Sequence, residues 1–256
     1  MDRTNMLADL CDPDKGYVCI RNMYTMAEVE HYRAECARFL LTGPRYETRI
    51  NTNSIPDYVQ ARSHDQVVRT FRIYQFLHNR HTPETTNFFD KVLTLRNDLE
   101  STWLGDDLYR QERERLQNYI IVTHYVENTG MLPRHQDYRG CAPHPLLQCL
   151  VLLAEPGQDF EGGDFVLHTK SGRTVSLAKD LNIQRGDLFL FDKSLFHHVE
   201  LTKRGRGRNR GRWSVLIGAR AARDSRIQSL YKRWRYGPLL RAARRIRKRS
   251  VASIHG

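Results

Sequence analysis

The sequence predicts a mainly β protein with flanking helices, whose core is a double-stranded β-helix of the jelly-roll or cupin type. Three observations predict this fold. Segments with a helical spacing of apolar residues lie before residue 116. After about Leu116, short apolar or alternating runs follow one another and are separated by Gly, Pro and Asp, which is typical of a β-sandwich or barrel. There are eight such runs, the strand count of a jelly roll.

The region 1–115 is expected to be helical or mixed and to pack on the barrel. Its first predicted strand is Gly16–Asn22. Thr25 and Glu28 then have the spacing of a helix capping box. A second helix is predicted from about Thr85 to Trp103, and Asn51–Arg62 is expected to be a loop. The first helix is predicted because the apolar residues after the capping box repeat with a helical period: Val29, Tyr32, Cys36, Phe39 and Leu40.

The region 116–222 contains the eight predicted strands and is expected to form the β-helix core. The strands cover residues 119–126, 132–137, 146–154, 164–168, 174–177, 187–191, 198–201 and 213–219.

Charge is distributed unevenly along the chain. The formal net charge is +12, but 18 of the 41 Lys and Arg residues lie between Lys203 and Arg249, with Asp224 as the one acid. The region 223–256 is therefore expected to be a basic, helical C-terminal tail. This asymmetry favours an anionic partner, such as nucleic acid, a membrane surface or a phosphorylated substrate; a solvated basic face explains it equally well.

The sequence argues against several classes of protein. No apolar run approaches the roughly 18 residues of a membrane-spanning helix. The N-terminus has no apolar segment of the signal-peptide kind. The five cysteines form no C-x-x-C pair, so a disulfide framework or a cysteine zinc site is not expected. The expected location is the cytoplasm.

A His-x-Asp pair, His135 and Asp137, lies in the predicted strand 132–137. Residues i and i+2 of a strand point to one face, so this imidazole and carboxylate can converge on one ion. A third ligand is expected from His197 or His198, which follow the apolar run GDLFLFD. Two histidines and one carboxylate leave three metal positions open, as in non-heme Fe(II) oxygenases.

A dicarboxylate co-substrate would need an anchor for its distal carboxylate, and the fork of an arginine suits this purpose. Arg212 opens the predicted strand RWSVLIGA, and Ser214 lies on the same face at i+2. Arg206, Arg208 and Arg210 precede it and stay open as alternatives.

Three motifs resemble the Fe(II)/2-oxoglutarate-dependent dioxygenases, in particular their prolyl/lysyl-hydroxylase-like or phytanoyl-type branches. RHQD (134–137) is similar to the family's H-x-D, and DFEGGDFVL (159–167) is similar to its Y-x-G-G-E/D-F segment. GDLFLFDKSLFHHVELTKRG (186–205) resembles the pattern G-D-L-x-L-F-x(5)-H-x-V. The resemblance covers some 100 residues, about Tyr119 to Ala219.

The resemblance implies a double-stranded β-helix and a set of site residues. His135, Asp137 and His197 correspond to the Fe(II) ligands, with His198 as the rival of His197. Arg212, assisted by Ser214, would bind the 2-oxoglutarate carboxylate. Tyr119, on the strand before H-x-D together with Tyr125, would contribute a hydrogen bond to it. The implied co-substrates are 2-oxoglutarate and O₂, and the implied products include succinate and CO₂.

The substrate is open at this point. Hydroxylation of an unactivated C–H bond of a small molecule is the favoured interpretation. A lipid-linked, carrier-linked or phosphorylated substrate is an alternative, and so is nucleic acid, as in the demethylases of alkylation repair. That branch resembles R-x-N/S-x-x-x-R, whereas Gly218 stands six residues after Arg212. A further alternative is a non-catalytic β-barrel that binds its partner through the basic tail.

Overall fold

A computed structural model describes residues 2–46, 56–64, 68–104, 116–137, 147–207 and 210–221. Residues 1–220 form one compact unit, to which the arrangement below refers. The predicted basic tail at 223–256 and the first part of the predicted loop at 51–55 lie outside the described residues.

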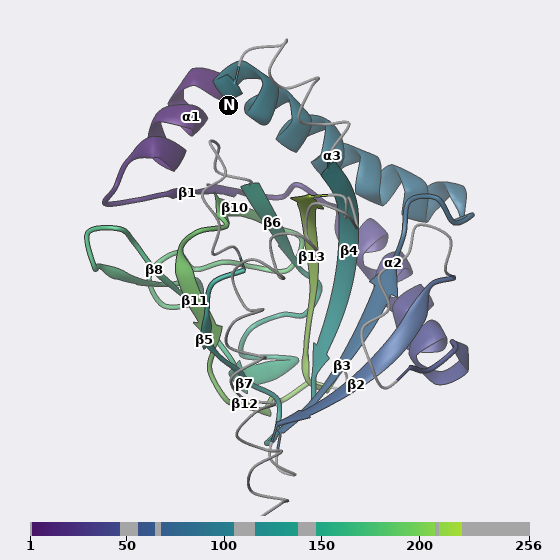
Figure 1. The fold of residues 1–256 in the computed structure, drawn as a ribbon. Helices are drawn as coiled ribbons and strands as arrows, with labels where there is room; N and C mark the ends of the chain where they lie inside the picture. The colour runs from purple at the N-terminus through teal and green to yellow at the C-terminus, as the bar shows by residue number, and fades with distance from the viewer. Residues whose placement is uncertain are drawn as a thin grey trace, which may run out of the picture. The chain divides into compact units, whose positions relative to one another are not determined.

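The described residues form a large sheet, a smaller sheet and a two-stranded ribbon (Figure 1). Strand pairs with a defined register are antiparallel, as in β10 against β6. The seven-stranded sheet has the order β1 (Tyr17–Ile20), β10 (Leu188–Asp192), β6 (Leu147–Leu152), β13 (Arg212–Ala221), β4 (Leu116–Tyr125), β3 (Val68–Gln75), β2 (Tyr58–His64). The four-stranded sheet is β5 (Leu132–His135), β11 (Phe196–Val199), β8 (Phe165–His168), β9 (Thr174–Ser176), and the ribbon pairs β12 (Thr202–Arg204) with β7 (Phe160–Gly162).

This arrangement confirms the predicted double-stranded β-helix. The eight predicted strands divide four and four: β4, β6, β10 and β13 join the large sheet, and β5, β8, β9 and β11 form the smaller one. The one shifted strand is that expected at 198–201, which instead spans Phe196–Val199. The shift brings both candidate histidines into the strand.

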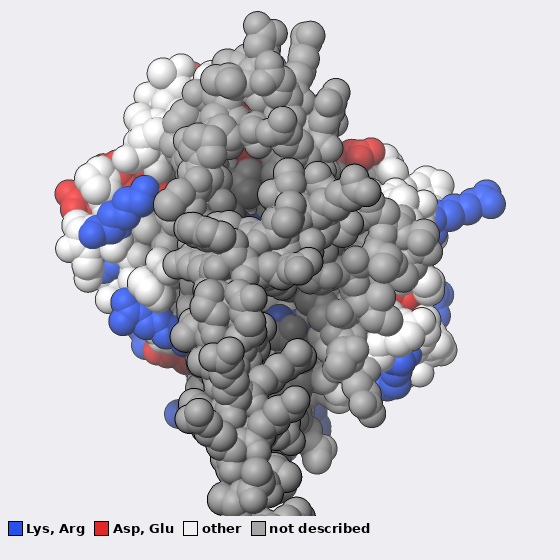
Figure 2. Space-filling view, viewed as in Figure 1, with Lys and Arg blue, Asp and Glu red and all other residues white. Residues whose placement is uncertain are grey.

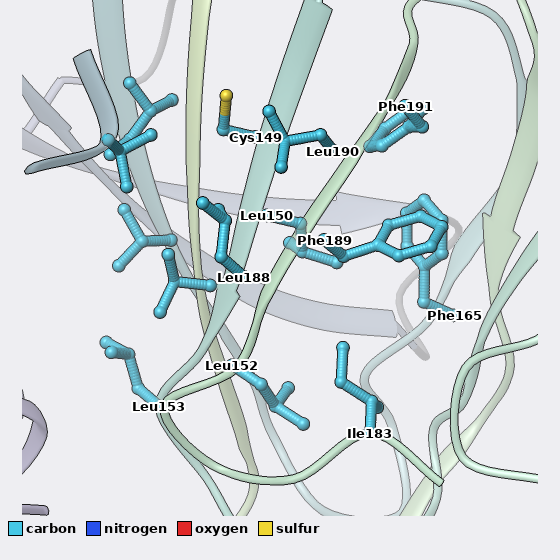
Figure 3. Close-up of a cluster of buried hydrophobic side chains, with 14 of the residues drawn as sticks. Cys149, Leu150, Leu152, Leu153, Phe165, Ile183, Leu188, Phe189, Leu190 and Phe191 are labelled. Atoms are coloured by element: carbon cyan, nitrogen blue, oxygen red, sulfur yellow. The ribbon is translucent and has the colours of Figure 1, made fainter. Parts of the chain in front are cut away.

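The core lies where the large sheet is covered on both faces. All residues of β6 and β10 are buried, which explains why LQCLVL and LFLFD are nearly continuous rather than alternating apolar runs. Figure 3 shows Leu150, Phe189 and Phe165 meeting on one side of these strands. Phe165 comes from β8 of the smaller sheet, and its ring centroid lies 5.9 Å from that of Phe189. Side chains of the two sheets therefore interdigitate.

The other face of the large sheet is covered by helices. They are α1 (Arg3–Cys11), α2 (Met26–Thr42) and α3 (Pro83–Leu104), and α2 packs on α3 and β3 while α3 also contacts β6. Tyr24 and Tyr32 both stack on Phe88 of α3, with centroids 4.0 and 4.3 Å away. Both predicted helices are confirmed. So is the capping box, in which Thr25 Oγ1 accepts from Glu28 N and Glu28 Oε2 accepts from Thr25 N.

The loop expected at Asn51–Arg62 is wrong in its second half, because β2 begins at Tyr58. β2 pairs with β3 along its whole length, and Tyr58 stacks on Tyr74 at 4.8 Å. Its apolar and polar residues alternate only weakly: Gln60 is polar yet buried, and it lies opposite Arg72 of β3. The prediction also missed α1, β3, β7 and β12. None of the described helices is long and apolar enough to cross a membrane.

The capping box gives a stability prediction. Replacing Thr25 with Ala removes the acceptor for the Glu28 amide, and we expect the free energy of unfolding to fall by about 1 kcal/mol. Urea denaturation measures it. Thr42→Ala is the control on the same helix, because the Thr42 hydroxyl is exposed and donates only to the Arg38 carbonyl. An equal loss in both variants would contradict the capping role.

Candidate active site

Three predicted metal ligands converge between the smaller and the larger sheet. His135 ends β5 and His197 lies directly opposite it on β11, where the two residues are cross-strand partners. Asp137 follows His135 by two residues. One ligand atom from each of the three lies within 4.8 Å of the others. His135 Nε2 is 3.6 Å from Asp137 Oδ1, and His197 Nε2 is 3.5 Å from Asp137 Oδ2.

Backbone carbonyls fix both rings in the orientation that a metal needs. The Nδ1–H of His135 donates to the Pro133 carbonyl at 2.8 Å, and that of His197 donates to the Leu195 carbonyl at 3.0 Å. A carbonyl can only accept, so each ring carries a proton on Nδ1 and directs its Nε2 toward the shared centre. Outer hydrogen bonds of this kind are the usual support of metal-ligating histidines.

The carboxylate of Asp137 is held in its charged form. Partial burial would raise its pKa, but hydrogen bonds and charges from His135 and His197 hold the pKa well below the usual range of a carboxyl group. The side-chain amide of Gln148, on β6, donates to Asp137 Oδ2. Gln136, between the two candidate ligands, donates to the Ser194 carbonyl at 2.7 Å and so fixes the turn after β5.

The two adjacent histidines of β11 point to opposite faces. His197 is buried, and its ring lies 5.2 Å from the rings of Phe165 and Phe191. His198 lies beside His168 of β8, with His168 Nε2 3.3 Å from His198 Nδ1. Because neighbouring residues of a strand face opposite ways, only His197 is directed toward His135 and Asp137.

The three residues line a cavity of about 460 Å³. Its walls combine both sheets: β3, β4, β6 and β13 contribute from the large sheet, and β5, β8 and β11 from the smaller one. In the view of Figure 2, Lys and Arg side chains of the described residues lie dispersed around the edge of the molecule. The lining residues are Arg72, Ile121, Thr123, Tyr125, Leu132, Pro133, Arg134, His135, Asp137, Leu150, Phe165, Lys193, His197, Val199, Arg212, Ser214 and Leu216.

Arg212 and Ser214 line the same cavity. Arg212 is among the largest fully buried side chains, and its Nη1 donates to Ser214 Oγ at 3.0 Å. Its guanidinium carbon lies 5.1 Å from the ring centroid of Tyr125. Burial lowers the pKa of Arg212, but a guanidinium stays charged in proteins. Burial raises the pKa of Tyr125, so its hydroxyl stays protonated and able to donate, although Arg212 and Arg72 partly oppose that shift.

The remaining sequence candidates fall elsewhere. Arg206 lies 3.6 Å from Glu161, and Arg210 lies 3.6 Å from Glu127; neither lines the cavity. Arg208 lies outside the described residues. Tyr119 belongs to β4, but its side chain is not among those described. Tyr125, on the same strand, lies in the cavity instead.

Sequence reasoning did not single out Gln148, Arg72 or Lys193 as site residues. Gln148 stands in an apolar run, LQCLVL, where one fully buried amide is a detectable anomaly. Arg72 belongs to a strand that the sequence did not predict, and Lys193 lies in the turn after β10.

The donor set fits a divalent transition metal. Two imidazole nitrogens and one carboxylate on one side of a cavity match the facial arrangement used for Fe(II), with the other side open to ligands. The two Nε2 atoms face the carboxylate oxygens of Asp137, which would share the metal with them.

A family model described as "Oxygenase, catalysing oxidative methylation of damaged DNA" matches residues 84–215, slightly more than half of the chain. The matched segment contains β4 to β12 and the opening of β13, and with them His135, Asp137, His197, Arg212 and Ser214. No curated protein sequence matches the chain.

Solved structures share the fold at low sequence identity. A prolyl-4-hydroxylase from Pseudomonas putida is 14% identical, with a TM-score of 0.57 over 86% of this chain and 99% of that protein. A Trichoplax adhaerens prolyl hydroxylase in complex with a hypoxia inducible factor peptide is 14% identical, with a TM-score of 0.52 over 89% and 92% of the two chains. An oxidoreductase of the 2OG-Fe(II) oxygenase family from Burkholderia pseudomallei is 13% identical, with a TM-score of 0.51 over 86% and 90%.

The geometry predicts which histidine matters for metal binding. Replacing His135, Asp137 or His197 with Ala should weaken Mn(II) binding beyond detection in a calorimetric titration, because each change removes one of three ligands. His198→Ala is the matched control, since that ring lies on the other face of the same strand. Loss of binding in His198→Ala with retention in His197→Ala would reverse the assignment.

Proposed function

We propose a hydroxylation reaction for this chain, which belongs to the Oxygenase-NA family and shares its fold with an oxidoreductase of the 2OG-Fe(II) oxygenase family. The enzyme would insert oxygen into an unactivated C–H bond of its substrate, with succinate and CO₂ as co-products. The observation that carries this proposal is the presence of two complete sets of donors in one cavity. His135, Asp137 and His197 form the first set, and Arg212 with Ser214 forms the second.

His135, Asp137 and His197 are the proposed Fe(II) ligands. Bound Fe(II), together with 2-oxoglutarate and O₂, supplies the oxidising power that breaks the C–H bond. The chain contributes the orientation of the ligands: Pro133 and Leu195 hold the imidazoles by their Nδ1 protons, and Gln148 holds one carboxylate oxygen of Asp137. Asp137 also argues for oxygenation rather than halogenation, which needs a free metal position in place of the carboxylate.

Arg212 is the proposed anchor of the distal carboxylate of 2-oxoglutarate. A buried guanidinium is a strong partner for a carboxylate, because the pair is formed away from water and can be bidentate. Ser214 orients one side of the fork and is itself close enough to the anchor to share the carboxylate. Tyr125 is a proposed hydrogen-bond donor to the same carboxylate. Its ring lies against the Arg212 guanidinium, and its hydroxyl stays protonated because burial raises its pKa. Tyr119, on the same strand, is proposed as a second tyrosine for this role.

The apolar part of the cavity is the proposed seat of the reacting carbon. Ile121, Leu150 and Leu216 line it on the large sheet, and Phe165 and Val199 line it on the smaller one. Such side chains exclude water from the metal's open side, which limits unproductive oxidation. A cavity of about 460 Å³ lies within the range of small-molecule sites, so a small-molecule substrate remains our first candidate.

Nucleic acid is the second candidate substrate. Two observations favour it: the printed description of the family refers to damaged DNA, and the chain carries a formal net charge of +12. A base flipped out of a strand would have to enter the same cavity. Formation of succinate with methylated single-stranded oligonucleotides, but not with small metabolites, would support this candidate over the first.

The iron assignment predicts a visible charge-transfer band. Anaerobic titration of the protein with Fe(II) and 2-oxoglutarate should develop the band of the chelate, and His135→Ala and Asp137→Ala should not develop it. Circular dichroism of each variant checks that the fold is retained. A folded wild-type protein without the band would favour the non-catalytic binding role.

The anchor assignment predicts a selective change in affinity for 2-oxoglutarate. Arg212→Ala should raise the concentration needed for half-saturation of the band by at least about 100-fold, because a buried charge-assisted pair is lost. Arg210→Ala serves as the control, since Arg210 is exposed and pairs with Glu127. The anchor is wrongly assigned if Arg210→Ala reproduces the effect and Arg212→Ala does not.

A further inference from the structure

We propose that His168 and His198 form a second metal site, which binds Zn(II) on the outer face of the smaller sheet. The site is separate from the catalytic cavity, and the inference goes beyond the proposed function. It comes from two neighbouring histidines that the catalytic site does not use. His168 ends β8, and His198 lies on β11, the strand beside it (Figure 1).

The strand register places both rings on the same face of the smaller sheet. His198 is the cross-strand partner of Val166, and His168 is the partner of Phe196, so the two histidines are diagonal neighbours. His197 precedes His198 on β11 and lines the catalytic cavity, so His198 is directed away from that cavity. Both rings are only partly buried, and the pair is therefore accessible to ions from the outside.

The separation of the two facing nitrogens matches the geometry of a zinc site. His168 Nε2 lies 3.3 Å from His198 Nδ1. Two Zn–N bonds of about 2.0–2.1 Å at a tetrahedral angle place their nitrogens about 3.3–3.4 Å apart, whereas ligands at a right angle would be about 2.9 Å apart. The ring centroids are farther apart than the nitrogens, at 5.4 Å. The rings therefore meet through their nitrogen-bearing edges, as two ligands of one ion do.

An imidazole pair suits a borderline transition metal, and the tetrahedral separation favours Zn(II). Without an ion, one of the two facing nitrogens donates to the other, because two acceptors would repel at 3.3 Å. With zinc both lone pairs bind the ion, and each ring carries its proton on the far nitrogen, Nδ1 of His168 and Nε2 of His198. Mn(II) has the lowest affinity for such donors, so a titration with Mn(II) reports the catalytic site.

The charges around the pair are compatible with a divalent cation. Arg134 is the positive charge that acts on His198, and its guanidinium carbon is held 4.7 Å from the centroid of a phenylalanine ring. Two carboxylates, Glu200 and Asp164, act on His198 with the opposite sign. The ion pair of Glu200 with an exposed lysine is long, at 3.8 Å, so its negative charge is only weakly compensated. The two carboxylates therefore outweigh Arg134.

The test counts the Zn(II) ions that the full chain binds in a calorimetric titration, after removal of metal and without an affinity tag. The wild type should bind two ions, one at the catalytic ligands and one at the outer pair. The double variant His135→Ala/Asp137→Ala keeps one catalytic ligand and should bind one ion. Adding His168→Ala or His198→Ala should weaken that remaining ion by at least about ten-fold, because a chelating pair loses one arm.

His31→Ala in the same double variant is the matched control. His31 is another accessible histidine, and its Nε2 lies 3.7 Å from a carboxylate oxygen of Glu35, so it tests for zinc held at any surface histidine. This change should leave the remaining ion unaffected. Zinc should also raise the thermal midpoint of the double variant, because it binds the folded state, and the increase should be lost with His168→Ala or His198→Ala. Thermal denaturation without zinc checks each fold.

Two outcomes would overturn the outer site. If the double variant binds no zinc, the role of His168 and His198 is limited to the hydrogen bond between them. If it binds an ion whose affinity is unchanged by His168→Ala and His198→Ala, or is lost in His31→Ala, that ion lies elsewhere and is adventitious. The proposed reaction is tested separately, because the charge-transfer band depends on the catalytic ligands and not on the outer pair.

Discussion

The site depends on the register of one strand pair, β11 against β5. His197 faces His135 across this pair, and both rings are directed into the cavity only in this register. Because side chains alternate along a strand, a slip of one residue would turn His197 outward and present Phe196 or His198 instead. Packing opposes such a slip: the ring of His197 lies against those of Phe165 and Phe191, whereas Phe196 is exposed. The apolar core thus sets the position of a polar residue.

Much of this arrangement could be predicted because the β-helix core has a regular signal. β6 and β10 are apolar apart from Gln148 and Asp192, and Gly and Asp separate the strands, so the number of core strands and their places in the chain follow from the sequence. The pairing of Arg212 with Ser214 follows from the two-residue period. The preference for His197 over His198 came from the resemblance alone, because the strand was expected to begin at His198 rather than at Phe196.

One missed strand, β3, and two missed site residues lie where the interior is polar. Thr70, Arg72 and Tyr74 of β3 lie on the same face of the sheet as Tyr58 and Gln60 of β2. This face mixes polar and aromatic residues, so the alternation of apolar and polar residues along β3 is weak. A polar interior is what a binding cavity requires, and it removes the periodic signal from which a strand is predicted. Gln148 and Arg72 were missed because their places in the site depend on the tertiary fold. Gln148 donates to Asp137, and Arg72 lines the cavity.

The place of β13 in the large sheet bears on how the chain reaches this structure. β13 is the last strand described, yet it lies in the interior of the sheet, between β6 and β4. β1, from the beginning of the chain, pairs with β10, about 170 residues later. Pairings this distant in sequence form slowly and leave strand edges open until the partner is available. A growing chain on the ribosome therefore has an incomplete sheet until β13 has emerged, and the arginine on that strand reaches its neighbours only then.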